Sequence, residues 1–135
     1  MGILNSNITL SFVLITTISL LLAVLSKFYI SASIGGLAFW FKRVHGFGGL
    51  FFNIGGLFSG ELIPIIFLPR IFSTIADYLP FKYLAYFQVQ LLLRQVDYKL
   101  IAIGVITQVL WLAFFVLISR IIWKAGLSQF EATGR

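Results

Sequence analysis

The sequence contains no cysteine and a single histidine, His45, among its 135 residues. Without cysteine there can be no disulfide, no thiolate metal site and no cysteine nucleophile. Only four acidic residues accompany the histidine, which is too few for a converging set of catalytic groups or metal ligands. The sequence therefore predicts no catalytic, metal or cofactor site, and we expect that the protein is not an enzyme.

Charge is also scarce, and apolar residues take its place. Charged residues make up 10% of the chain, against roughly 25% in soluble domains. Hydrophobic residues make up 60%, and the mean hydropathy is +1.04. This composition predicts an integral membrane protein. The net charge of +6 indicates anionic lipid headgroups as partners rather than nucleic acid.

The apolar runs predict three membrane spans within a single transmembrane domain, residues 1–135. The first run, residues 8–41, is interrupted only by Lys27 and is longer than the ~30 Å hydrocarbon core requires. It is either one long, kinked helix that loosens near Gly35 and Gly36, or two pieces that meet at Lys27. The lack of a turn signal around Lys27 favours one helix. The other spans are residues 47–63 and 100–123, followed by a tail, residues 124–135.

All three prolines of the chain fall between the second and third spans, in residues 64–95. Pro64, Pro69 and Pro80 each remove a backbone donor and forbid a straight helix through their position. In lipid, a broken backbone survives only where protein or a water-filled cavity covers it. The segment is therefore predicted to be re-entrant or interfacial. The expected fold is an all-α integral membrane protein of about three transmembrane helices, with short broken helices between the second and the third.

Two ionisable residues at membrane depth are candidates for function, because such residues are costly in lipid. Glu61 either lines a translocation path or caps the turn before Pro64. Lys27 lines a path, pairs with another group or extends to the headgroups, and nothing in the sequence puts it at the depth of Glu61. Asn53 and Pro64 join them as candidates for the path or for a structural turn.

Other residues indicate packing or a partner. Gly56 and Gly60, with Ser59 beside them, form a small-xxx-small pattern that favours close helix packing, as does the group from Ser31 to Ser33. Lys42 and Arg43 are expected to be interfacial anchors. The distribution of basic residues slightly favours a cytoplasmic C-terminus.

Four motifs occur in an order that resembles the C-terminal half of ABC-2 type transporter permeases, over about residues 35–135. They are G-L-A-F-W at 36–40, S-G-E-L-I-P at 59–64, L-P-F-K-Y-L-A-Y-F at 79–87 and W-K-A-G-L-S-Q-F-E-A at 123–132. The resemblance is to the small bacterial six-span permeases. Where that family usually has proline after the Tyr-Phe pair, this chain has Gln88.

The resemblance implies a permease subunit, or the C-terminal half of one, of an ABC-2 type exporter in the bacterial cell membrane. It implies a share of the translocation path, short re-entrant helices on the outer face and a cytoplasmic C-terminus. The implied partners are a separate ABC ATPase and a second permease subunit or a missing N-terminal half. With an ATPase as partner, a contact with it is the alternative role for Lys42 and Arg43. The chain itself has no G-x-x-x-x-G-K-[ST] motif for nucleotide. The alternative is a non-transport membrane protein, either an assembly factor or a holin-like pore former.

Overall fold

The computed structural model describes the backbone of residues 10–41 and 44–133 and, in the second stretch, the side chains of residue 46 and residues 48–128. All regular elements in these stretches are helical, which confirms the predicted all-α class. In chain order they are α1 (Leu10–Gly36), η1 (Leu37–Phe39), α2 (Val44–Ser59), η2 (Ile65–Phe67), α3 (Arg70–Tyr78), η3 (Pro80–Tyr83), α4 (Tyr86–Leu92) and α5 (Tyr98–Thr133).

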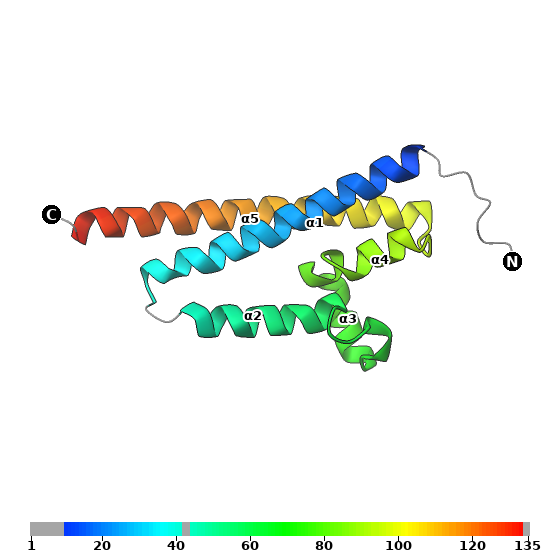
Figure 1. Ribbon diagram of the computed structural model, residues 1–135, viewed down its shortest axis with the longest axis horizontal. Helices are drawn as coiled ribbons and strands as arrows, with labels where there is room; N and C mark the ends of the chain where they lie inside the picture. The colour runs from blue at the N-terminus through cyan, green and yellow to red at the C-terminus, as the bar shows by residue number, and fades with distance from the viewer. Residues whose placement is uncertain (1–9, 42–43, 134–135) are drawn as a thin grey trace, which may run out of the picture.

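Two long apolar helices, α1 and α5, lie side by side and run in the same direction (Figure 1). Their 27 and 36 residues correspond to about 40 and 54 Å at 1.5 Å per residue. The stretches Leu10–Phe39 and Tyr98–Ser128 are both long and apolar enough to cross a membrane. At the predicted second span, α2 has only 16 residues, about 24 Å, which is shorter than the ~30 Å hydrocarbon core.

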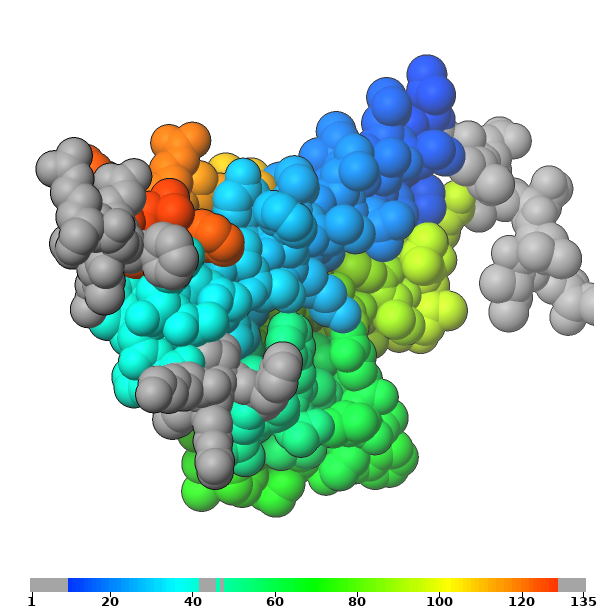
Figure 2. All heavy atoms as spheres, turned by 60° about the vertical axis from the view of Figure 1, so that its left-hand side comes forward, coloured from blue at the N-terminus to red at the C-terminus, as the bar shows by residue number. Residues whose placement is uncertain are grey.

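The first helix passes Lys27 without interruption, so the single-helix alternative describes this region. After Gly36 the α-helix gives way to the 3₁₀ turn η1. The chain then reverses into α2, which runs back beside α1. The space-filling view shows the segment from α2 to η3, in teal and green, packed together along one side of α1 (Figure 2).

Small and polar residues form the contact between α1 and α5. The buried residues of α1 recur every three or four positions and so form one stripe: Ser19, Ala23, Ser26, Ile30, Ser33 and Gly36. On α5 the buried residues include Gly104, Gln108, Ser119 and Gly126. The contact is close, because a methyl group at Gly36 of α1 would lie 2.6 Å from Cγ2 of Ile122 on α5. The Trp123 indole N–H donates to the carbonyl of Ala32 at 3.0 Å.

The prolines bound the short helices between α2 and α5 as the sequence predicts. α3 begins directly after Pro69 and ends before Pro80. After Pro80 the helical path is interrupted once more, because η3 ends at Tyr83 and α4 begins at Tyr86. The break leaves the Tyr83 carbonyl as an acceptor for the side-chain amides of Gln88 at 3.3 Å and Gln108 at 2.9 Å.

A buried polar cluster of Ser19, Gln88 and Gln108 fastens this segment to the long helices. The three residues are 0%, 5% and 2% exposed. The Ser19 hydroxyl lies 3.1 Å from Oε1 of Gln88 and 2.8 Å from Oε1 of Gln108, and the Gln88 amide donates to the Ser19 carbonyl at 3.1 Å. Because the cluster joins α1, α4 and α5, it places the segment against the first half of α1.

Beside the cluster, an aromatic ring fills the space left by a glycine. Phe87 packs with Leu91 and Ile101 in a small apolar core. A methyl group at Gly104 would lie 2.2 Å from Cζ of Phe87, so the ring can occupy this position only because residue 104 is glycine. Core packing of this kind is sensitive to single added carbons.

The polar cluster predicts energetic coupling between its glutamines. We expect Gln88→Leu and Gln108→Leu each to lower the free energy of unfolding by about 1–2 kcal/mol, because each leaves buried groups without a partner. The double variant should lose less than the sum, by roughly 0.6–1.5 kcal/mol. Unfolding in mixed micelles with increasing SDS measures this. Gln90→Leu, on the same helix but outside the cluster, should change stability by under about 0.5 kcal/mol. Strictly additive losses would contradict the coupling.

Candidate functional site

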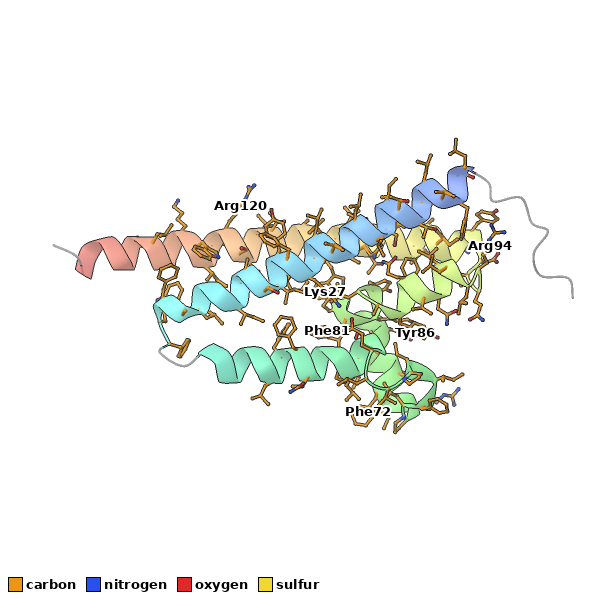
Figure 3. All side chains as sticks on the ribbon, in the orientation of Figure 1. Lys27, Phe72, Phe81, Tyr86, Arg94 and Arg120 are labelled. Atoms are coloured by element: carbon orange, nitrogen blue, oxygen red, sulfur yellow. The ribbon has the colours of Figure 1, made fainter. Side chains whose placement is uncertain are left out.

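Lys27 of α1 and Glu61, just after α2, form an ion pair with 2.5 Å between Nζ and Oε1. The sequence alone did not pair them, and the structure brings them together. Their side chains are 49% and 43% exposed, so the chain leaves about half of each uncovered. Figure 3 shows Lys27 on α1 opposite Phe81 of η3. The pair is therefore a charged site on the side of an otherwise apolar helix.

A left-handed glycine directs Glu61 towards α1. Gly60 has φ of +80° and follows the last residue of α2, where glycine is favoured because it has no Cβ. The backbone N–H of Glu61 donates to the carbonyl of Gly56 at 3.1 Å, which is the long bond of a Schellman motif. The Ser59 hydroxyl donates to the same carbonyl at 3.2 Å. The end of α2 thus fixes the backbone of Glu61.

Gly56, Gly60 and Ser59 accordingly belong to this turn within the chain. A methyl group at Gly56 would lie 3.2 Å from Leu62, the residue just beyond the turn. Ser59 is buried, with 2% of its surface exposed. Close packing of these residues against a further helix, which the sequence pattern indicates, stays a prediction.

The ion pair lies far from either end of α1. At 1.5 Å per residue, Lys27 is about 25 Å from Leu10 and about 14 Å from Gly36. The helix α2 runs back beside α1 and ends next to Lys27. Glu61, which follows α2, therefore lies beside Lys27 and not beside the start of α1. The part of α1 that precedes Lys27 is contacted by α4, at the end of the broken segment. The charges therefore lie well within the length of α1 that would cross a membrane.

A cavity of about 90 Å³ adjoins the pair between α1, α2 and η3. Its lining combines the two charged side chains with aromatic and small residues: Lys27, Ile30, Phe51, Phe52, Gly55, Gly56, Ser59, Glu61, Phe81 and Leu84. One water molecule needs about 15 Å³ of such space. The cavity can therefore hold a few water molecules beside the charges, but it is too small for a large solute.

The other predicted site residues take separate places. Asn53 of α2 is exposed, and its side chain makes no hydrogen bond within the described part of the chain. Pro64 precedes η2, and its carbonyl accepts the N–H of Phe67 at 2.9 Å. Lys42 and Arg43 lie outside the described residues. No group of three His, Asp or Glu residues that could hold a metal ion occurs in the described stretches.

Sequence reasoning missed the polar cluster, although two signals for it are present. Ser19, Ser26 and Ser33 recur at seven-residue intervals, which places them on one face of a helix. Gln88 stands where the resemblance leads one to expect proline, and its amide makes four contacts within hydrogen-bonding distance of Ser19 and Tyr83. A polar side chain at that place in an apolar segment indicates a buried partner.

No curated protein and no solved structure matches the sequence. The family described as ABC-2 family transporter protein matches residues 1–134. This match includes the first long helix, which precedes the four motifs at 36–132. Membrane proteins of this family typically lack an ATPase domain and generally pair with ATPase subunits. Two helices of spanning length, broken short helices between them and a family match over nearly the whole length lead to one conclusion: the chain belongs to the ABC-2 transporter family.

Proposed function

We propose that the chain is a permease subunit, or the C-terminal half of one, of an ABC-2 type exporter in the bacterial cell membrane. In this proposal the face around Lys27 and Glu61 lines part of the translocation path. The chain crosses the membrane with α1, with α2 together with the segment that follows it, and with α5. The C-terminus is cytoplasmic. ATP hydrolysis is supplied by a separate subunit.

The ion pair is the observation that carries the proposal. A charged side chain at the centre of a membrane helix costs about 2.5–3.5 kcal/mol, even on the more lenient insertion scales. Pairing Lys27 with Glu61 offsets part of this cost, but about half of each side chain remains exposed. Lipid would leave those halves without polar contacts. Water or other protein must therefore cover them, and a path between this chain and the rest of the transporter provides such cover.

Two further observations support a covered face on α2. Asn53 exposes an amide on an apolar helix and has no hydrogen-bond partner within the described residues. In addition, α2 is too short to cross alone, so the broken segment after it has to complete the crossing. That segment is covered on one side by α1 and α5, through the cluster at Gln88. Its other side requires further protein or water.

The energy source has to come from another subunit, because the sequence has no phosphate-binding loop. We propose a separate ABC ATPase, together with a second permease subunit or a missing N-terminal half, as partners. The end of η1 lies beside Trp123 of α5, with ring centroids of Phe39 and Trp123 5.5 Å apart. Lys42 and Arg43 follow this point in the sequence, and the proposal assigns them to the contact with the ATPase.

Thiol labelling tests whether the face at the ion pair is wet. The chain has no native cysteine, so one introduced cysteine gives no background. In the assembled transporter, Phe52→Cys, which lines the cavity, should react at least tenfold faster with a membrane-impermeant methanethiosulfonate than Leu50→Cys. Phe52 and Leu50 lie on the same helix and are both exposed in the chain. Equal rates at the two positions would rule out a water-filled path at this face.

A charge exchange tests the ion pair itself. Lys27→Glu and Glu61→Lys each place two like charges side by side, and we expect each to lower stability in detergent by about 1 kcal/mol. The double variant restores opposite charges and should recover most of the loss, as the melting temperature would show. Lys124→Glu, which reverses an exposed charge of α5 that has no ion pair within the described residues, serves as the control and should change little. A double variant no more stable than either single one would mean that the pair does not form.

ATP hydrolysis tests the division of labour. The purified chain alone should hydrolyse no ATP and give no ATP-dependent flux in liposomes, because it lacks a nucleotide site. ATP hydrolysis coupled to flux should appear only when the separate ATPase and the other permease part are added to form the complete transporter. Hydrolysis by the isolated chain would refute the permease assignment if it persists when the chain is purified from a host that lacks contaminating ATPases. Ion leakage from liposomes that contain the chain alone would instead favour the holin-like alternative.

A further inference from the structure

A second depression, of about 240 Å³, lies between η3, α4 and the first turns of α5. Its lining shares no residue with the cavity at Lys27. One side is polar and carries Lys82, Tyr86, Gln90 and Gln95, whereas α5 contributes the apolar side chains of Leu100 and Ile103. Phe87 of α4 and Val96 add to the apolar part, so the groove is amphipathic.

The polar side consists largely of groups that can donate hydrogen bonds. Lys82 pairs with Asp77 and lies 5.8 Å from the ring centroid of Tyr86. An ammonium group has three N–H donors, so one carboxylate leaves donors for another acceptor. The side-chain amides of Gln90 and Gln95 and the Tyr86 hydroxyl make no hydrogen bond within the described part of the chain. A cation flanked by amide and hydroxyl donors suits a phosphate group.

The position of the groove indicates the source of the phosphate. Leu100 and Ile103 lie within the first two turns of α5, about 3 and 8 Å from its start. Arg94, before α5, marks the same end of the molecule, and Tyr86 lies towards that end (Figure 3). In a membrane-spanning helix these turns meet the boundary between headgroups and acyl chains. The apolar side of the groove continues from there towards the membrane interior.

We propose that this groove binds a membrane phospholipid. The phosphate lies at Lys82 with the amides of Gln90 and Gln95, and an acyl chain lies along Leu100 and Ile103. The lipid is a bound component of the protein surface, separate from the path proposed at Lys27. It covers apolar surface at the place where the broken segment meets α5.

Native mass spectrometry of the full chain in detergent, titrated with defined lipids, tests the proposal. Dioleoyl phosphatidylglycerol and dioleoyl phosphatidylcholine should both bind, because both contain the phosphate diester. Dioleoylglycerol, which lacks the phosphate, should bind about tenfold more weakly, as expected for the loss of a charge-assisted hydrogen bond. Glycerol phosphate, which lacks the acyl chains, should bind at least a hundredfold more weakly.

Three variants of groove residues and one control variant locate the site. Lys82→Gln and the double variant Gln90→Leu/Gln95→Leu should each weaken phospholipid binding about tenfold, whereas Lys82→Arg should retain it. Lys99→Gln removes the same charge from an exposed residue at the same end, outside the groove, and should change binding less than twofold. If Lys82→Gln does not fold because Asp77 loses its partner, the double glutamine variant decides alone. Unchanged binding in that variant, an equal loss in Lys99→Gln, or equal affinity for dioleoylglycerol or for glycerol phosphate would each overturn the proposal.

Discussion

The close contact between α1 and α5 is the interaction on which the other elements depend. In lipid the hydrophobic effect gives helices no reason to associate, so packing and hydrogen bonds must hold them together. The stripe of Ser19, Ala23, Ser26 and Ser33 keeps the surface of α1 small, and glycines do the same on α5. Rings from other parts of the chain then enter the glycine positions. The two long helices thus form a frame to which the shorter elements attach.

The same frame makes the broken segment possible. A chain interrupted by prolines has backbone carbonyls that accept no hydrogen bond within a helix. In lipid these carbonyls need hydrogen-bond donors from elsewhere in the protein or from water. At the break between η3 and α4, the Tyr83 carbonyl accepts amides from Gln88 and Gln108. Gln88 comes from the segment and Gln108 from the frame, so the bonds that satisfy the break also dock the segment. A proline at residue 88 would supply no amide for either purpose.

The sequence predicted the kinds of element better than the contacts between them. Composition and apolar runs predicted long helices, and the prolines predicted the short broken helices between α2 and α5. The pairing of Lys27 with Glu61 could not be predicted, because it depends on the left-handed conformation of Gly60, which ends α2 before Glu61. In the sequence, Gly56 and Gly60 have the spacing of a helix-packing pattern, and only the backbone distinguishes that role from a helix end. Ser19, the distant partner of Gln88, lies 69 residues away in the sequence, too far for a local sequence pattern to indicate the contact.

The early end of α2 connects the fold with the proposed path. If α2 continued as a full span, Glu61 would lie near the far surface, where a carboxylate costs little. Because Gly60 stops the helix beside Lys27, the carboxylate instead meets the ammonium group within the stretch of α1 that is long and apolar enough to cross a membrane. The two charges cancel, but their exposed halves still need polar surroundings that neither lipid nor this chain supplies. The water-filled path that we propose between this chain and the rest of the transporter would meet this need, and it would also cover the open side of the broken segment.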